Sequence, residues 1–475
     1  MYRKLFLVAA FLWGIAAMAL AEGKAKYVFY FIGDGMGVNQ VNGTETYLAA
    51  LEGRIGTKPL CFPSFPHAAF VTTQSGTNGV TDSAAGGTAL STGHKTKNGT
   101  LGLLADQSTP VSSIAVWAQR AGAAVGVSTS VSVDHATPAA FYAHQASRES
   151  YYAIGQDLVK AGFDFYAGSD FLQPVPKDGA TAEGTLYDQC LRAGYVIARG
   201  YDDFKQKAKA ASRLVLLQTE DASKKQRNSL PYAIDRTPAD MTLSEVAQAG
   251  IDFLTSRSGK DGFFLMVEGG KIDWACHGND VGTAFRELAD MDEAVRVAYA
   301  FYEQHPDETL IVVTADHETG GLSLGRGPYE LHTDLLKYQR MSAEAYASHL
   351  KALHRQLGDG FTWERVEADL ADNWGFGREV SITAEQKKRL HEAYDATVSG
   401  KAKDKESLYA KVGELADEAR RVMAECALIG WQSGGHSDGY VPVFAVGAGA
   451  EQFAGRIDNT EIPVKIAKAA GWKAE

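Results

Sequence analysis

A single serine stands at the head of a run of small residues, where little surrounds its hydroxyl. Ser83 follows Asp82 in the stretch TDSAAGGTAL, which spans residues 81–90. The alanines favour a slim helix, although Gly86 and Gly87 are poor helix formers. At the first turn of such a helix, backbone N–H groups and the positive end of the dipole attract an anion. A serine here is commonly an N-cap, so Ser83 becomes a candidate nucleophile only if other reactive groups join it.

Carboxylates and imidazoles follow three apolar runs that are typical of strands. They are Asp34, Glu268, Asp273, His277, Asp316 and His317. Asp273 and His277 are four residues apart, which predicts that they share one face of a helical turn. The carboxyl ends of parallel strands form the ligand crevice of an α/β sheet, so these groups should meet there. Because a metal ion relieves the repulsion between buried carboxylates, the pattern predicts a metal site, and its mixed ligands suit zinc-like ions better than calcium.

The elements that must position these groups alternate along the chain. Strand-like runs such as KYVFYFIG, AAVGVSTSV, RLVLLQT, GFFLMVE and TLIVVT are separated by helix-like segments such as YYAIGQDLVKAG, LSEVAQAGIDFLTSR and AFRELADMDEAVRVAYAFYEQ. The strand runs are continuously apolar, as in a sheet that is covered on both faces. The sequence therefore predicts an α/β fold with a central, largely parallel sheet and helices on both faces.

The strand signal lapses from about residue 328 to 430. Three helices are expected there, in EAYASHLKALHRQL, TAEQKKRLHEAYDA and SLYAKVGELADEARRVMAECALIG, with SGKAKDKES as a polar connector. The third helix is indicated by the spacing of Leu408, Val412, Leu415, Ala419, Val422 and Cys426. YVPVFAVGAG then returns to the sheet. We expect one catalytic domain over residues 22–475 with a mostly helical insertion at about 328–430.

The first 21 residues have the pattern of a secretory signal. Two basic residues precede LFLVAAFLWGIAAMALA, whose small-x-small end predicts cleavage after Ala21 and a periplasmic or secreted protein. A retained membrane anchor is the alternative, but the run is short for a span, and no stable anchor is expected. Removing the two basic residues takes the formal charge from −11 to −13, which argues against nucleic-acid binding. The four cysteines match no zinc knuckle, and their pairing stays open.

Six motifs, in order, resemble those of the alkaline phosphatase family. They are YFIGDGMG, VTDSAAGGTALSTGHKT, ATPAAFYAH, VEGGKIDWACH, TADHETGG and SGGHSDGYVPVF, and they extend over nearly the whole mature chain. The resemblance implies that family's fold, hydrolysis of small phosphate monoesters, two zinc ions with a third, magnesium site, and a homodimer.

The resemblance also implies a role for each matched residue. Ser83 would be the nucleophile that is transiently phosphorylated. One zinc ion would be held beside Ser83 by Asp34, Asp316 and His317. The second, which activates the water, would be held by Asp273, His277 and His436. The third site would use Asp34, Thr137 and Glu268. Arg148 would grip the phosphate and Asp82 would orient Arg148.

Elementary chemistry agrees with these roles. A serine hydroxyl is a poor nucleophile at neutral pH, and metal coordination at a helix N-terminus stabilises its alkoxide. Two metal ions can clamp the attacking and leaving oxygens, and an arginine can hold two phosphoryl oxygens. Four carboxylates, three divalent ions and Arg148 would leave a cavity charge of about +3, which favours a monoester dianion over a diester monoanion.

Two positions depart from the pattern common in bacterial members. His135 stands where many have an aspartate, and Trp274 stands where a lysine is frequent, as in other members of the family. A neutral imidazole would tilt the third site from magnesium toward zinc or cobalt, unless His135 is a hydrogen-bonding neighbour that binds no metal. We expect Cys276 to pack in the interior and His94 to lie in an exposed loop.

Other hydrolases fit less well. A superfamily relative acting on phosphodiesters is the main alternative; such enzymes tend to have threonine as nucleophile and to lack the arginine. Sulfatases need a C/S-x-P-x-R setting, whereas Ser83 is followed by AAGG. A Ser-His-Asp esterase would have its nucleophile in a G-x-S-x-G elbow, whereas Ser83 stands in TDSAA. A further alternative is a binding protein without enzymatic activity, in which metal ions only stabilise the fold.

Overall fold

The computed structural model describes residues 24–474 except 178, 180–182, 407–408 and 410. The expected signal segment, residues 1–21, lies outside the described residues. The centre of the molecule is a ten-stranded sheet with the order β16-β2-β15-β8-β1-β7-β3-β4-β6-β5. Its strands are β16 (Gly455–Asp458), β2 (His67–Thr72), β15 (Val441–Gly447), β8 (Thr309–Thr314), β1 (Tyr27–Gly33), β7 (Phe263–Gly269), β3 (Ala124–Thr129), β4 (Phe165–Gly168), β6 (Arg213–Leu217) and β5 (Tyr195–Arg199).

The sheet is largely parallel, as the sequence predicted. Among its described pairings, only those of β15 with β2 and β8 are antiparallel. Strands β1, β7 and β8 are buried along their whole length, which explains their continuously apolar sequences. Their register brings the reactive ends together, because Ile32 of β1 is level with both Glu268 of β7 and Thr314 of β8.

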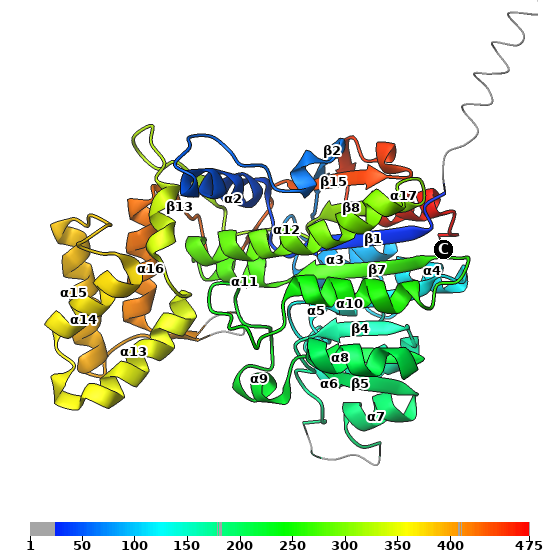
Figure 1. Cartoon of the computed structure of the whole chain (residues 1–475), viewed down its shortest axis with the longest axis horizontal. Helices are drawn as coiled ribbons and strands as arrows, with labels where there is room; N and C mark the ends of the chain where they lie inside the picture. The colour runs from blue at the N-terminus through cyan, green and yellow to red at the C-terminus, as the bar shows by residue number, and fades with distance from the viewer. Residues whose placement is uncertain (1–23, 178, 180–182, 407–408, 410, 475) are drawn as a thin grey trace, which may run out of the picture.

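Helices cover both faces of this sheet (Figure 1). One layer contains α2 (Val38–Leu51), α8 (Tyr201–Lys207), α10 (Leu243–Thr255) and α12 (Val281–Gln304). The other contains α3 (Ser83–Thr92), α4 (Ile114–Arg120), α5 (Ala136–Ala139) and α17 (Glu461–Ala470). The remaining helices of this part are α6 (Tyr151–Ala161), α7 (Leu186–Arg192), α9 (Glu220–Lys225) and α11 (Lys271–His277). Strand β1 starts near the C-terminus of the chain and runs toward α11 and the helical insertion (Figure 1).

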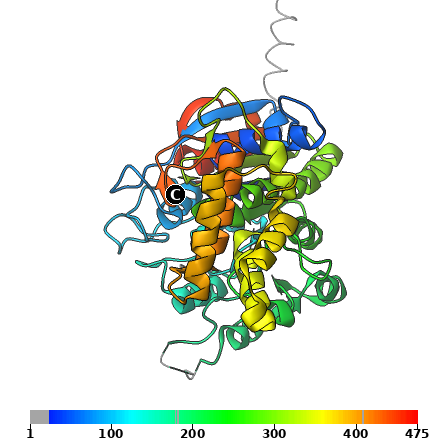
Figure 2. The same cartoon turned by 90° about the vertical axis from the view of Figure 1, so that its left-hand side faces the viewer.

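The insertion is a helical unit with a hydrophobic core of its own. It contains α13 (Ala343–Leu357), α14 (Trp363–Trp374), α15 (Ala384–Val398) and α16 (Glu414–Cys426), after a 3-10 turn at Thr333–Tyr338. Figures 1 and 2 show these helices gathered at one end of the molecule, beside α11 and beyond the carboxyl ends of the central strands. The helix α14 had not been predicted.

The expected third helix of the insertion was wrong at its start. Leu408 lies outside the described residues. Val412 belongs to β12 (Lys411–Val412), within the segment that was expected to be helical, and β12 pairs with β11 (Lys405–Glu406), which lies in the expected connector. The helix begins only after Gly413, whose extended backbone (φ −69°, ψ 152°) interrupts the helical spacing. It ends at Cys426, and Ile429–Gly430 form β13, which pairs with β10 (Ser323–Leu324).

Two further findings bear on the expectations from sequence. The four cysteines, all within the described residues, form no disulfide. In the part of the chain that the structure describes, no helix has both the length and the apolar character needed to cross a bilayer.

Candidate active site

Ser83 is the first residue of α3, and the small residues that follow it allow the helix to pack closely. Asp82 caps the helix by accepting a hydrogen bond from the Ala85 N–H at 3.0 Å. A Cβ atom added at Gly86 would lie 3.0 Å from the Asp316 carbonyl oxygen. One added at Gly87 would lie 3.2 Å from the Ala140 Cβ. Glycine at these positions therefore brings Ser83 against the strand ends that carry the acidic groups.

A first group of ligand-type atoms surrounds the Ser83 hydroxyl. The His317 Nε2 lies 3.2 Å from the Ser83 Oγ and 3.3 Å from both the Asp34 Oδ1 and the Asp316 Oδ2. All four side chains are buried. Neither of these two carboxylate oxygens has a hydrogen-bond partner among the described residues. Buried, unpartnered carboxylate oxygens beside an imidazole nitrogen fit a divalent cation such as zinc.

A second group is formed by Asp273, His277 and His436. The two Nε2 atoms are 3.1 Å apart and lie 3.3 and 3.6 Å from the Asp273 carboxylate oxygens. Each Nδ1 faces a backbone carbonyl, that of Gly434 at 2.6 Å from His277 and that of Thr81 at 2.8 Å from His436. A carbonyl only accepts, so each Nδ1 must donate, and in the neutral rings both Nε2 lone pairs point at one another. A shared cation satisfies that arrangement.

A third group lies on the other side of Asp34. Ligand atoms of Asp34, His135 and Glu268 lie within 4.8 Å of one another. The Thr137 hydroxyl is 3.4 Å from the Asp34 Oδ2. The Glu268 Oε1 and both ring nitrogens of the buried His135 have no hydrogen-bond partner among the described residues. This donor set is also suited to a cation, and His135 lies close enough to the two carboxylates to be one of its candidate ligands.

Arg148 lies close to the nucleophile and is held by Asp82. Its Nη1 donates to the Asp82 Oδ2 at 3.0 Å, whereas its buried Nη2 has no hydrogen-bond partner in the described chain. Asp82 also accepts from the Gly99 N–H at 3.0 Å. Burial raises the pKa of Asp82, but the charge of Arg148 and these backbone N–H groups outweigh it, so the carboxyl stays ionised. One guanidinium nitrogen is thus anchored while the other is available to an anion.

Electrostatics supports a demand for cations at this place. Burial, followed by repulsion from neighbouring carboxylates, raises the pKa values of Asp34 and Asp316. Burial raises the pKa of Glu268 to about 7 and lowers that of His135 to about 3. Burial also opposes the charge on Asp273 and His277, but their mutual attraction is stronger and raises the pKa of His277 to about 9. Without added cations, the site resists carrying four carboxylate charges.

The structure thus brings together every site residue that the sequence analysis singled out. Trp274 is buried and lies edge-on to the His135 ring at 5.9 Å. Cys276 is buried and His94 exposed, as expected.

Sequence reasoning missed Thr319. Its hydroxyl lies 2.5 Å from the Asp273 Oδ1 and 3.2 Å from the His317 Nδ1, so it links the first two groups. Thr319 lies in the motif TADHETGG, two residues after His317, and this spacing was the available signal. A short pairing of β9 (Glu318–Thr319) with β14 (His436–Ser437) places His436 beside His317, and their rings stack at 3.6 Å.

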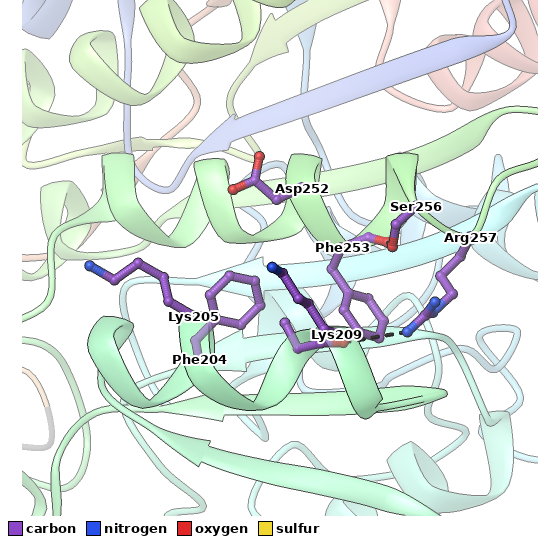
Figure 3. Close-up of a pocket in the computed structure, with 8 residues that line it drawn as sticks. Phe204, Lys205, Lys209, Asp252, Phe253, Ser256 and Arg257 are labelled. Atoms are coloured by element: carbon purple, nitrogen blue, oxygen red, sulfur yellow. Dashed lines mark hydrogen bonds between the residues drawn. The ribbon is translucent and has the colours of Figure 1, made fainter.

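A separate pocket of about 460 Å³ lies between α8 and α10 (Figure 3). It is lined by Phe204, Lys205, Ala208, Lys209, Asp252, Phe253, Ser256 and Arg257. Lys205 pairs with Asp202, and Arg257 donates to the Ala211 carbonyl. The pocket contains none of the residues described above, so it contributes nothing to the reactive site.

Comparison with known proteins gives a consistent result. The family model for alkaline phosphatase matches residues 25–472. Alkaline phosphatase 3 of Bacillus subtilis is 31% identical over 455 residues, which cover 94% of this chain and 89% of that protein.

Solved structures resemble this one over nearly the whole chain. A cold-active alkaline phosphatase from a psychrophilic Shewanella species has a TM-score of 0.76 and 29% identity, covering 94% of this chain and 99% of that one. A histidine-to-glutamate mutant of the alkaline phosphatase TAB5, from an Antarctic bacterium, has a TM-score of 0.65 and 25% identity, covering 95% and 99% of the two chains. That mutant has Mg bound in a site called M3.

Proposed function

We propose, starting from the fact that this chain belongs to the alkaline phosphatase family, that it hydrolyses phosphate monoesters through a phosphorylated Ser83. That it is a phosphatase follows from the family; the intermediate and the metal stoichiometry are the proposal. The observation that carries it is the 3.2 Å approach of the Ser83 Oγ to the His317 Nε2, beside two buried carboxylate oxygens that have no hydrogen-bond partner among the described residues. A nucleophile and cation ligands are then in one place.

Two zinc ions, one held by the first group and one by Asp273, His277 and His436, would supply Lewis acidity and charge neutralisation. The Ser83 oxygen would attack phosphorus as its proton passes to solvent, and the bond to the leaving oxygen would break on the opposite side. The departing oxygen takes a proton from water and leaves as the alcohol. Water then attacks the phosphoserine along the path that the alcohol left by, which releases phosphate and regenerates Ser83. The N-terminus of α3 favours the developing charge on the serine oxygen.

Arg148 would bind the phosphoryl group. Its Nη2 is buried and has no hydrogen-bond partner among the described residues, while Asp82 fixes the other arm of the guanidinium. A fork of two N–H donors fits two phosphoryl oxygens, and this orientation favours a monoester dianion.

The third site would be held by Asp34, Thr137 and Glu268, with magnesium as the family's usual ion. His135 favours zinc or cobalt there, because within the described part of the chain neither of its nitrogens has a hydrogen-bond partner and one could serve as a ligand. Magnesium in the M3 site of the TAB5 mutant suggests the test. His135→Asp should raise the magnesium content per chain at the expense of zinc. Full magnesium occupancy in the unaltered protein would rule out the zinc or cobalt assignment.

The runner-up is hydrolysis of phosphodiesters, and substrate choice separates the two. We expect much faster hydrolysis of p-nitrophenyl phosphate than of bis(p-nitrophenyl) phosphate. Ser83→Ala should lower monoester turnover by about 10³-fold or more while the zinc content stays the same. If Ser83→Ala retains turnover, Ser83 is not the nucleophile. If the unaltered protein has no turnover, and Ser83→Ala binds phosphate as well as the unaltered protein does, the chain is a binding protein rather than an enzyme.

Export and a homodimeric assembly complete the proposal. Export is supported by the signal-like pattern of residues 1–21, and the homodimer by the family resemblance. Periplasmic fractionation and sedimentation of the purified protein test the two separately.

A further inference from the structure

Tyr409 is the residue of the helical insertion that reaches the reactive site. It lies between β11 and β12, whose pairing sits beside α13. Nearby residues such as Val412 and Leu415 belong to the core of the insertion. The Tyr409 side chain instead packs against the core of the central sheet. The insertion therefore contributes a side chain to a site that is otherwise built by the strands and their loops.

The ring of Tyr409 lies flat on the ring of His277. The two centroids are 4.6 Å apart and the planes are inclined by 11°. Tyr409 also meets the Trp274 ring edge-on at 5.9 Å, and Trp274 meets His135 in the same way. Four rings thus form a continuous aromatic wall along one side of the second and third groups of ligand atoms.

This wall adjoins the second group of ligand atoms, where the proposed mechanism puts the leaving alcohol. Ser83 approaches the first group, next to His317. In an in-line displacement the leaving oxygen is opposite the attacking one, and the second group, which contains His277, is the part of the site that would receive it. The Tyr409 ring is only half-buried and stacks on His277 of this group, so it lies beside the place where the substituent on that oxygen would sit.

We propose that Tyr409 is a specificity-determining residue, whose ring stacks with planar leaving groups and makes this site prefer aromatic phosphate monoesters. The inference rests on the proposed function and adds a substrate class to it. An aromatic pair contributes a modest amount beyond its buried area, so the preference should be about three- to tenfold.

Benzyl phosphate and ethyl phosphate provide the test, since both release a primary alcohol and differ mainly in the ring. Relative to the unaltered enzyme, Tyr409→Ala should lower kcat/KM for benzyl phosphate about three- to tenfold, mainly through KM, and leave ethyl phosphate within about twofold. Tyr409→Phe should keep the preference because it retains the ring. The exposed Tyr329, in the same insertion, provides the control variant Tyr329→Ala.

Zinc content should be unchanged in Tyr409→Ala, because zinc binding does not depend on the leaving group. Tyr409 also lies near Arg148, so competitive inhibition by inorganic phosphate is compared between Tyr409→Ala and Tyr409→Phe, which both lack the hydroxyl, and the two variants should agree. A parallel loss for both substrates, or a loss of zinc, would show that Tyr409 only supports His277 and would overturn the inference. If Tyr409→Ala does not fold, Tyr409→Leu removes the aromatic face but keeps the bulk, and the same outcomes apply. An unaltered protein that hydrolyses neither ester would instead refute the proposed function.

Discussion

Two clusters of charged side chains adjoin the first turn of one short helix, α11, and only one of them contains opposite charges. The acidic cluster consists of Asp34, Glu268, Asp273 and Asp316, none more than 1% exposed. The mixed cluster consists of Arg236, Lys271, Glu287 and Asp290. Asp273 and Lys271 are two residues apart in α11, so one helix contributes to both.

The mixed cluster contains its own counter-charges. The Arg236 guanidinium contacts both Asp290 oxygens, at 3.0 and 2.8 Å. The Lys271 Nζ donates to the Ser229 Oγ at 2.9 Å and lies 3.4 Å from the centre of the Tyr232 ring, while Glu287 accepts from the Ala233 N–H at 2.5 Å. In the acidic cluster, by contrast, three carboxylate oxygens have no hydrogen-bond partner within the described residues. Among the described residues, the Arg236 Nε is the one buried polar atom of the mixed cluster without a hydrogen-bond partner. The comparison teaches that a buried cluster of like charges indicates a missing ligand, whereas a cluster that contains opposite charges indicates a structural role.

Removal of metal ions should have the largest effect and only through the acidic cluster. A chelator should lower phosphatase activity by at least about 10³-fold and the free energy of unfolding by roughly 4 kcal/mol, for zinc supplied at about 1,000 times its Kd. Activity assays and urea unfolding before and after chelation measure both, and added zinc should restore them. Unchanged stability in the chelated protein would contradict the comparison.

Breaking the mixed cluster should affect stability without affecting the metal ions. Lys271→Met leaves Glu287 buried without that cation and should cost about 3–5 kcal/mol in urea unfolding. Lys271→Met combined with Glu287→Gln should recover part of the loss, because no unpaired charge remains. Zinc content serves as the control. Additive losses in the double variant would mean that the two side chains do not interact.

The pH dependence of stability should distinguish the metal-free from the zinc-loaded protein. Without metal, burial lowers the pKa of His277, but the attraction of the Asp273 carboxylate is stronger and raises this pKa to about 9, above its ordinary value of 6.5. The protonated His277 therefore adds about 3 kcal/mol to the free energy of unfolding. This contribution is complete below pH 6.5 and is lost as the pH rises to about 9. The raised pKa values of Asp34 and Asp316 act in the same direction. In the proposed metal centre zinc would take the place of the proton, so identical profiles of the two forms between pH 6.5 and 9 would contradict metal binding at His277.

The smallest effect is expected where the acidic cluster is already hydrogen-bonded. Thr319→Val removes the hydroxyl between Asp273 and His317 and should lower zinc affinity or kcat about tenfold. Thr319→Ser keeps the hydroxyl and should behave like the unaltered enzyme. Zinc titration with a competing chelator measures the affinity. Equal behaviour of the valine and serine variants would exclude a positioning role for Thr319.

Much of the fold could be predicted because its signals are local. The continuously apolar runs of β1, β7 and β8 indicate strands that are covered on both faces, and the structure has them. Local signals failed in the insertion, where the spacing from Leu408 to Cys426 favoured one helix. A glycine at 413 and strand pairing at 411–412 divide that segment. Helical spacing alone carries no information on such pairing partners.

The sequence by itself determined which reactive groups exist and that most of them follow buried strands. It also determined, through the motif order, the family to which they belong. Tertiary structure decided which nitrogen of His277 and of His436 faces the acidic cluster, that Thr319 joins two groups, and that Tyr409 crosses from the insertion to His277. The reason is that these contacts join residues far apart in the chain. Their geometry depends on sheet register and loop closure, which no local pattern encodes.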